Sequence, residues 1–543
     1  MLNTKDSWDV KTDIIVVGSG SGALTSAIVG RECGAEVFLL ETTDKIGGGT
    51  AYSGGMLWIA NNPHMLKLGI KDSRENALTY IRHTGGGHHV EDLTVAFIDT
   101  APEMLEYIEE KAGMEMEVIR PCPDYYPEHP GGTTEGRALQ PKIFDSKRLG
   151  DWQNKLRLSP HLPIPSNIPE LIKWGGYCKI SNWDWGLLAK RMEDGIVGFG
   201  SSLIGHLMKA CLDREVNIML QTRGIELVRD DTNRIVGIKA EQEGRTVFIQ
   251  GRLGIILACG GYEWNENLRR LNCSPTLEAS TPPSNCGDGH IMALEAGAAW
   301  AHLDESAGTC LAIPGETHEG KTLYRIFVEE PARPGMIMVN QQGKRFTNEG
   351  MYKTAEEDMV RFDGSKQIYP NLPCYLIYDH NHKTKYVFGS VMPDDNAPEW
   401  MNCSSSLREL ALKLAINPDT LDETVNNFNS YARKGKDPEF HRGDSAYARF
   451  WGDPFHKPNP SLGTIEKPPF YGFKAIRSVL GTKSGLVTNA NAQVINVRGE
   501  PIQGLYAVPN TAAHLALGRG MTSGQTLAQS MTFGYIAAKH MTK

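Results

Sequence analysis

No stretch of about eighteen consecutive apolar residues occurs in this sequence, so we expect no membrane-spanning helix. The ten cysteines stand singly, without a Cys-x-x-Cys pair or a histidine cluster, which predicts reduced thiols and no metal site. The 56 Lys and Arg residues are outnumbered by 64 Asp and Glu residues, and the net charge of -8 gives no basic field to attract nucleic acid. The polar N-terminal residues leave no room for the apolar core of a signal peptide. These absences favour a cytoplasmic protein that acts on small molecules.

What the sequence does contain is the material for a large folded protein. Its 543 residues, 40% of them hydrophobic and 22% charged, have the composition of an ordinary globular chain. A chain of this length exceeds the size at which a single hydrophobic core stops growing, so we expect two or three packed units. Such a protein can enclose a large cofactor.

The N-terminal region carries a glycine motif typical of dinucleotide binding. Residues 13–17 predict a buried parallel strand, and the residues from 24 onward predict a helix. Gly18 allows the tight turn between them, Gly20 lets the backbone approach a pyrophosphate, and the small Ala23 lets helix and strand pack closely. A second predicted strand ends at Glu41, where an acidic side chain can accept a hydrogen bond from a ribose hydroxyl.

A second glycine-rich segment follows directly. Five of the nine residues from Gly47 to Gly55 are glycine, and this crowding of the backbone suits a long dinucleotide. Near the C-terminus, a strand predicted at 504–510 runs into a turn, and a helix predicted at 525–540 begins near Gly524 with its N-terminus toward the cofactor. The cofactor contacts expected from these segments, and from the paired glycines that end a strand beginning at 253, are Gly48, Gly49, Thr50, Ser53, Gly54, Gly55, Gly260, Asn510, Thr526 and Leu527.

The middle of the sequence predicts further elements. Strands at 218–221 and 225–228 suggest a β-meander before the strand that begins at 253. Asp288, in a Gly-Asp-Gly sequence, begins a predicted helix whose start can face the cofactor, although a plain helix cap explains the residue equally well.

These motifs make the sequence resemble the fumarate reductase and succinate dehydrogenase flavoprotein superfamily, and within it the 3-ketosteroid Δ1-dehydrogenase group. The likeness extends over nearly the whole chain, and its motifs fall in family order at family spacing. Besides the two glycine segments, it is carried by Pro123-Asp-Tyr-Tyr-Pro-Glu, Glu135-Gly-Arg, Gly287-Asp-Gly, Pro334-Gly-Met-Ile-Met-Val-Asn, Gly343-Lys-Arg-Phe-Thr-Asn-Glu, Gly481-Thr-Lys-Ser-Gly-Leu and Met531-Thr-Phe-Gly-Tyr.

The resemblance implies an α/β fold with two units. A Rossmann-like FAD-binding domain, made of a parallel sheet and a β-meander, is expected in residues 1–277 and 480–543, and an inserted α+β substrate-capping domain in 278–479. In succinate dehydrogenase-like relatives a histidine beside the flavin loop is covalently linked to FAD. The corresponding stretch here is Gly49-Thr50-Ala51-Tyr52, so the resemblance implies non-covalent FAD.

The resemblance also implies catalytic residues. In the ketosteroid dehydrogenases one tyrosine takes a proton, a second lowers the pKa of the first, and a third polarises the ketone together with a backbone N–H. The second tyrosine maps onto Tyr125, with Tyr126 as an alternative. The base maps onto Tyr352 if one residue is missing relative to the family motif, and onto Lys353 otherwise. We favour Tyr352, because a phenol matches the expected base.

The third tyrosine is absent from this sequence. Its position falls on Gly520, and of the family's Tyr-Pro-Gly-Pro-Gly only the last glycine remains, as Gly524, which can still donate an N–H. Replacement donors nearby in sequence are Arg519, Thr522, Ser523 and His514. Of these, Arg519 would suit a carboxylate or an enolate. An apolar lining for the substrate is expected in the capping domain, although core packing explains its aromatics at least as well; the candidates are Trp300, Tyr324, Phe327 and Trp400.

Three functional hypotheses follow. The first is an FAD-dependent dehydrogenase that introduces a carbon-carbon double bond next to the carbonyl of a cyclic ketone and passes electrons to an external acceptor. The second is an ene-reductase of the fumarate reductase type, which takes electrons from an external donor and reduces an activated alkene such as a cyclic enone. The third is a redox-silent flavin-binding protein. Gly520 gives the third some weight, whereas Tyr125, Tyr352 and Gly524 argue against it.

Overall fold

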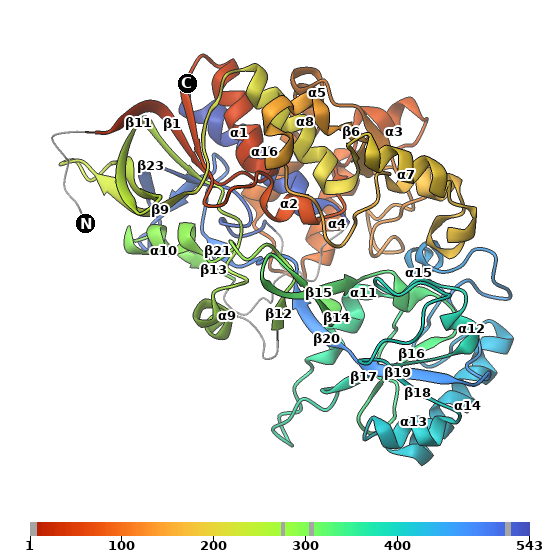
Figure 1. The fold of residues 1–543 in the computed structure, drawn as a ribbon. Helices are drawn as coiled ribbons and strands as arrows, with labels where there is room; N and C mark the ends of the chain where they lie inside the picture. The colour runs from red at the N-terminus through yellow and green to blue at the C-terminus, as the bar shows by residue number, and fades with distance from the viewer. Residues whose placement is uncertain (1–7, 273–276, 303–308, 516–522) are drawn as a thin grey trace.

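The protein is an α/β molecule with a larger and a smaller part (Figure 1). The computed structural model describes residues 8–272, 277–302, 309–515 and 523–543. In the larger part the blue C-terminal helix α16 (Gln525–Met541) packs against the red N-terminal helix α1 (Ser21–Glu32). The green to light-blue middle of the chain forms most of the smaller part, which we call the cap.

An eight-stranded sheet forms the base of the larger part. Its strands run in the order β22-β23-β11-β1-β2-β8, and β10 and β9 extend from β11. Five neighbouring strands of this sheet pair with one another in parallel: β8, β2, β1, β11 and β23. Their carboxyl ends therefore lie at one edge of the sheet, where open α/β folds bind ligands. The bounds are β1 (Val10–Val17), β2 (Val37–Leu40), β8 (Asn217–Met219), β9 (Thr222–Arg229), β10 (Ile235–Gln242), β11 (Arg245–Leu257), β22 (Gln493–Ile495) and β23 (Pro501–Ala507).

The β-meander is present, but its strands differ from those expected. The residues near 218 do not enter it, because β8 pairs in parallel with β2 and extends the main sheet. The meander consists of β9, β10 and the first half of β11, which pair antiparallel to one another. The second half of β11 turns to parallel pairing with β1, so one long strand joins the meander to the main sheet.

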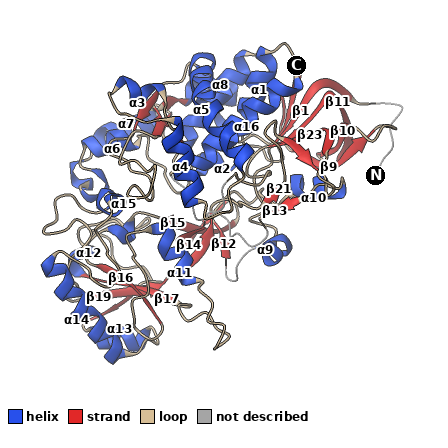
Figure 2. Cartoon of the chain, turned by 180° about the vertical axis from the view of Figure 1, so that it is seen from behind, coloured by secondary structure: helices blue, strands red, loops and turns tan. Residues whose placement is uncertain are grey.

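Both faces of the central strands are buried, as parallel sheets require. Along β1, Ile14 and Val16 pack into a core with helices α1, α5 (Glu91–Ala112), α8 (Phe199–Asp213) and α16. The alternate residues Ile15 and Val17 belong to a second core on the opposite face, beneath the meander. Figure 2 shows the four helices gathered together beside the sheet. Among the described residues, no helix is both long and apolar enough to cross a membrane.

The cap contains two four-stranded sheets. One has the order β12-β20-β14-β15, with bounds β12 (Leu277–Ala279), β14 (Thr309–His318), β15 (Lys321–Phe327) and β20 (Ile476–Val479). The other has the order β16-β17-β19-β18, with bounds β16 (Met336–Asn340), β17 (Cys374–Asp379), β18 (Asn402–Ser404) and β19 (Phe470–Lys474). Its helices include α11 (Tyr352–Met359), α13 (Leu407–Lys413), α14 (Pro418–Lys434) and α15 (Ala446–Trp451).

The chain crosses between the two parts more often than the expected boundaries at 278 and 479 imply. Helix α10 (Asp288–Glu295) packs on β9, and β13 (Trp300–Ala301) pairs with β21 (Gly485–Leu486) next to the C-terminal segment. We therefore propose that residues 288–301 belong to the larger part, whereas β12 just before them belongs to the cap.

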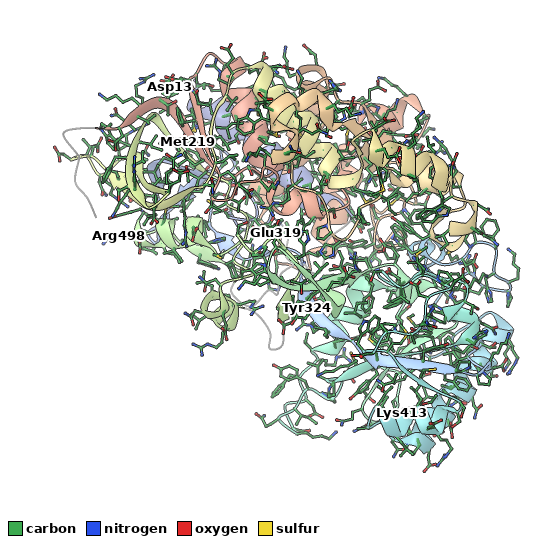
Figure 3. The ribbon with its side chains drawn as sticks, viewed as in Figure 1. Asp13, Met219, Glu319, Tyr324, Lys413 and Arg498 are labelled. Carbon is green, nitrogen blue, oxygen red and sulfur yellow. The ribbon has the colours of Figure 1, made fainter. Side chains whose placement is uncertain are left out.

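The β14–β15 hairpin joins the two parts. Glu319, at its turn, pairs with Arg157 of the larger part. Figure 3 shows Glu319 and Tyr324 between the two parts, far from Lys413 at the outer end of the cap. This hairpin therefore holds the cap against the edge of the larger sheet at which parallel strands end.

Candidate functional site

A cavity of about 650 Å³ lies at this edge, and residues of both parts form its wall. Every cofactor-binding residue and every favoured catalytic residue from the sequence lines it, apart from Arg519, which lies outside the described residues. Those residues are Gly18, Gly20, Ala23, Glu41, Gly48, Gly49, Thr50, Ser53, Gly54, Gly55, Tyr125, Gly260, Asp288, Tyr352, Asn510, Gly524, Thr526 and Leu527. Of the other replacement donors, Ser523 lines the cavity, His514 does not, and Thr522 lies outside the described residues.

The end of β1 forms a turn that only glycine can make. Gly18 has φ of 109°, and a Cβ on it would lie 2.2 Å from the carbonyl oxygen of Ala258, which follows β11. Its N–H donates to the Leu40 carbonyl at 2.7 Å, so three strand ends meet there. Gly20 caps helix α1 without any side chain, and the N–H of Ser21 donates to Thr50 Oγ1 at 3.1 Å. The start of α1 lies on the cavity wall, and a helix N-terminus is a place where an anion such as a pyrophosphate binds.

Glu41 follows β2 and is 6% exposed. Its carboxylate accepts hydrogen bonds from Ser19 Oγ at 2.5 Å and from the backbone N of Thr43 at 2.9 Å. Burial raises the pKa of Glu41, and these hydrogen bonds oppose the rise. A carboxylate has about four acceptor positions, so it can accept a ribose hydroxyl in addition.

The glycine segment after Glu41 is not a simple loop. Residues Gly48–Tyr52 form a short helix, α2, which packs against α8. A Cβ on Gly200 of α8 would lie 2.0 Å from the Thr50 carbonyl, and one on Gly55 would lie 2.6 Å from the backbone of Phe199. The glycines in this region thus serve close packing of one helix on another as well as space for a cofactor.

Asp288 is not a helix cap. The cap position of α10 belongs to Gly287, and the Asp288 carboxylate pairs with Arg223 of β9 at 2.6 Å. Both side chains line the cavity near the ends of β2 and β11. The alternative interpretation of this residue as a plain cap is therefore wrong.

Tyr125 and Tyr352 come together from the two parts of the molecule. Their ring centroids are 5.7 Å apart at an interplanar angle of 74°. On its other side Tyr125 lies 5.1 Å from the ring of Tyr447, which is buried and whose pKa burial raises well above its ordinary value. The two residues that the resemblance singled out thus form one cluster of phenols on the cavity wall.

Buried ion pairs position both tyrosines. Asp124, which precedes Tyr125, accepts hydrogen bonds from Trp58 Nε1 at 2.7 Å and from Arg137 at 2.9 Å. On the cap side, Arg345 pairs with Glu349 at 2.8 Å, shortly before Tyr352 begins α11. The motifs around residues 123–128, 135–137 and 343–349 therefore hold the tyrosines in place.

The alternative residues point elsewhere. Lys353 is 4% exposed and pairs with Glu356. Burial lowers its pKa, but the carboxylates of Glu356 and Glu357 outweigh burial, so the net shift is upward and the side chain stays charged. Neither Lys353 nor Tyr126 is among the residues that line the cavity. These placements favour Tyr352 and Tyr125.

Gly524 lies at the N-terminal cap of α16, with φ of 87°. A Cβ there would lie 2.8 Å from the backbone of Met56, and its carbonyl accepts from Trp58 N at 3.2 Å. Gly520, like Arg519, lies outside the described residues, so the replacement of the family tyrosine by this glycine stays a prediction.

The aromatic lining is not where the sequence suggested. Trp300, Tyr324, Phe327 and Trp400 do not line the described cavity. Phe327 packs in the cap core, and Trp300 packs against Tyr262 and His290. The aromatic residues that do line it, besides the predicted tyrosines, are Tyr52, Tyr177, Trp183, Trp185 and Phe199. The density of aromatics between 174 and 185 was the signal that could have indicated this wall.

The residues on the cavity wall that were not predicted include His161, Glu329, Glu330 and Arg333. His161 Nε2 lies 2.9 Å from the carbonyl of Ser280, and burial lowers its pKa to about 4. Among the described residues, no group of three or more His, Cys, Asp or Glu side chains could hold a metal ion.

A parallel sheet with a glycine turn after β1, an acidic residue after β2 and a long cavity at the strand ends defines a dinucleotide-binding flavoprotein fold. The chain belongs to the FAD binding domain family, whose sequence model matches residues 13–527. FAD is therefore its cofactor, and the N-terminus of α1 on the cavity wall, the glycines and Glu41 fit that group.

Close relatives cover nearly the full chain. A 3-oxosteroid 1-dehydrogenase of Mycobacterium tuberculosis is 34% identical over 97% of this chain and 98% of the relative. A 4-oxocyclohexanecarboxylate 2-dehydrogenase of Sinomonas cyclohexanicum is 32% identical over 97% of this chain and 92% of the relative. Among solved structures, a 3-ketosteroid Δ1-dehydrogenase of Sterolibacterium denitrificans superimposes with a TM-score of 0.90 and 31% identity, covering 98% of this chain and 99% of that one.

Proposed function

We propose that this protein is an FAD-dependent dehydrogenase that forms a carbon-carbon double bond next to the carbonyl of a cyclic ketone. The observation that carries the proposal is the contact between Tyr125 and Tyr352 on the wall of the cavity that the glycines after β1 and β2 also line. The relatives named above act on ring ketones, as steroids or as cyclohexane derivatives, which supports the same substrate class. The singly placed free cysteines support a cytoplasmic location.

Removal of two hydrogens from adjacent carbons requires a base, a hydride acceptor and a group that acidifies the carbon losing its proton. FAD, when bound, accepts the hydride and passes its electrons to an external acceptor. In our proposal the phenol oxygen of Tyr352 takes the proton from the carbon next to the carbonyl. Tyr352 is the first residue of α11, where the helix N-terminus favours a negatively charged phenolate.

The carbonyl oxygen of the substrate needs a hydrogen-bond donor as negative charge develops on it. We assign this role to the backbone N–H of Gly524, at the start of α16. Both the N–H and the helix N-terminus stabilise negative charge there. Arg519 is proposed as a further donor on sequence grounds alone.

The ene-reductase alternative has less support. It would use Lys353 as the proton donor, but that ammonium group is buried beside Glu356 and does not line the cavity. The redox-silent alternative would leave the pairing of Tyr125 and Tyr352 without a purpose.

The experiment is anaerobic addition of ketones to the oxidised holoenzyme while the visible flavin absorbance is followed. Saturated cyclohexanones should bleach it, and 3-ketosteroids should do so more slowly, because Gly520 offers no side-chain donor to the ketone. The ene-reductase would be favoured instead if no cyclic ketone bleached the flavin, and if a cyclic enone restored the flavin absorbance of enzyme that had been reduced beforehand.

The base is tested by Tyr352→Phe, which should keep FAD bound but lower turnover by about two to four powers of ten. Tyr431→Phe, on α14 of the cap and outside the cavity wall, is the matched control and should behave as wild type. If Lys353→Met proves more damaging than Tyr352→Phe in correctly folded holoenzyme, the assignment of the base is wrong.

A further inference from the structure

The cap presents four charged residues to the cavity, and one of them, Arg325 of β15, is neutralised by its ion pair with Glu316 at 2.5 Å. The other three lie together. Glu329, Glu330 and Arg333 flank and form the short helix η4 (Glu330–Ala332), and all three line the cavity wall. They lie near Tyr177 of the aromatic wall, because the Arg333 guanidinium stands 5.9 Å from its ring centroid. Among the described residues, no lysine lines the cavity.

Glu329 is the group at this place that can change its charge. Its carboxyl accepts a hydrogen bond from its own backbone N–H. A carboxylate has about four acceptor positions, so others remain available to a ligand in the cavity. Burial raises its pKa to about 7, the nearby carboxylate of Glu330 adds to the rise, and Arg333 opposes it. Glu330 is engaged differently, since its Oε2 accepts from the backbone N of Val328 at 3.1 Å.

Arg333 does not neutralise this place completely. It is 2% exposed and donates from Nη1 to the Val387 carbonyl at 2.5 Å, while its Nε has no partner in the described part of the chain. Among the described residues no carboxylate lies within ion-pair distance of it. With both glutamates ionised, one negative charge remains beside the cavity, and protonation of Glu329 removes it.

No other group around Glu329 changes this net charge near pH 7. The groups that feel the charge of Glu329 from the elements packed around it are Tyr177, Cys122 and Tyr447. Burial raises the pKa of each of them, so all three stay neutral near pH 7.

We infer that the cap end of the cavity selects an uncharged cyclic ketone over one that carries a carboxylate, with Glu329 as the selecting residue. This inference rests on the proposed function and narrows its substrate class. A ligand carboxylate would be placed in a site of low dielectric beside an ionised Glu329, where like charges repel more strongly than in water. A neutral polar group would meet a carboxyl that can donate a hydrogen bond when protonated and accept one when ionised.

The test compares 4-oxocyclohexanecarboxylate with 4-oxocyclohexanecarboxamide, two ligands of nearly the same shape that differ in charge. Dissociation constants are measured from the shift of the oxidised flavin spectrum in the holoenzyme, at about pH 6 and about pH 8, on either side of the Glu329 pKa of about 7. Wild type should prefer the carboxamide by at least about tenfold at the higher pH, and the preference should shrink at the lower pH.

Glu329→Gln should bind the carboxylate more tightly than wild type and lose the pH dependence, a gain that structural damage would not produce. Arg333→Met should change the preference in the opposite direction, further against the carboxylate. Glu423→Gln, on the outer helix α14, should match wild type.

The inference is overturned if wild type binds the carboxylate as tightly as the carboxamide at both pH values, or if neither ligand binds. Because the titration reports binding and flavin bleaching reports turnover, the outcome is separate from that of the proposed function. If the carboxamide binds tightly but does not bleach the flavin, the inferred selectivity stands and the proposed dehydrogenase activity is rejected.

Discussion

At the scale of single residues, Glu41 shows how a buried carboxylate can serve structure and cofactor together. Its oxygens hold Ser19 and Thr43 in place, and it lies where the ribose of a dinucleotide is recognised in this fold. The acid after the second strand was predictable, because the motif fixes its distance from the first glycines. The hydrogen bonds to Ser19 and Thr43 were not, because they depend on how the turn after β1 meets the end of β2.

Glu41→Ala should weaken FAD binding by about 1.5–3 kcal/mol, the contribution of a hydrogen bond to a charged group. Titration of the apoprotein with FAD, followed by flavin fluorescence, measures the change. Glu423→Ala, on α14 in the cap, is the control. An unchanged affinity for FAD in Glu41→Ala would place the ribose contact on another residue.

Glu329 makes folding stability depend on pH. Its pKa rises from 4.5 to about 7 on folding, so the folded chain holds the proton more tightly than the unfolded chain. Stability is therefore lost as the pH rises from about 4.5 to about 7, and the loss is complete above that range. Glu329→Gln should remove this penalty and be more stable than wild type above pH 7 by an amount on the order of 1–3 kcal/mol.

The measurement is urea unfolding of FAD-saturated wild type and Glu329→Gln at about pH 5 and about pH 8. The difference between the two proteins should be small at the lower pH and larger at the higher. An equal difference at both pH values would mean that the carboxyl of Glu329 stays ionised throughout.

At the scale of elements, helices α1 and α16 connect the two ends of the chain. Their backbones approach closely, since a Cβ on Gly22 would lie 2.3 Å from Ser530 Oγ and one on Gly534 would lie 2.5 Å from the Gly22 carbonyl. Ser26 Oγ donates to the carbonyls of both Gly22 and Gly534, at 2.8 and 3.1 Å. The close helix crossing explains these glycines, which a cofactor motif alone does not.

Gly22→Ala should therefore destabilise the protein by about 1–3 kcal/mol, the usual cost of overfilling a packed interface. It should also weaken FAD binding, because Gly22 lines the cavity. Gly364→Ala is the control, since a Cβ there meets nothing within 4 Å and its φ is ordinary. Thermal unfolding of the two variants checks the difference, and equal melting temperatures would contradict the packing argument.

Elements with a strong local pattern were predictable from the sequence. The strand, glycine turn and helix at the N-terminus and helix α16 lie where their patterns indicated, within a few residues. Strand β10 and the parallel placement of β8 were missed, because pairing partners are chosen by the sheet and not by the strand's own residues. Helix α2 was missed because glycines flank it in the sequence, and glycines predict a loop. Only its packing against α8 shows that the segment is helical.

At the scale of the whole molecule, the site depends on bringing together distant segments. Tyr125 comes from the larger part, Tyr352 from the cap, and Gly524 from the C-terminal segment, yet all three line one cavity. Only the resemblance could suggest their proximity, because nothing local to any of them indicates the others. Glu329, Arg333 and the aromatic wall have no such motif, so the structure was needed to find them.

The last prediction concerns how the whole protein holds FAD. The stretch that carries the linking histidine in covalent relatives contains none here, and Gly49 lies on the cavity wall instead. Purified protein should be yellow, and acid or heat should release the FAD into the supernatant, because the cofactor is held only while the fold persists. The one result that would contradict this expectation is a covalent link to His161. This residue lines the cavity, its Nδ1 has no partner within the described residues, and its lowered pKa of about 4 keeps the ring neutral and nucleophilic. The test is the absorbance of pellet and supernatant after precipitation of wild type and His161→Ala. Colour that stays with the wild-type pellet but not with that of His161→Ala would establish a covalent link at this residue and reject non-covalent binding.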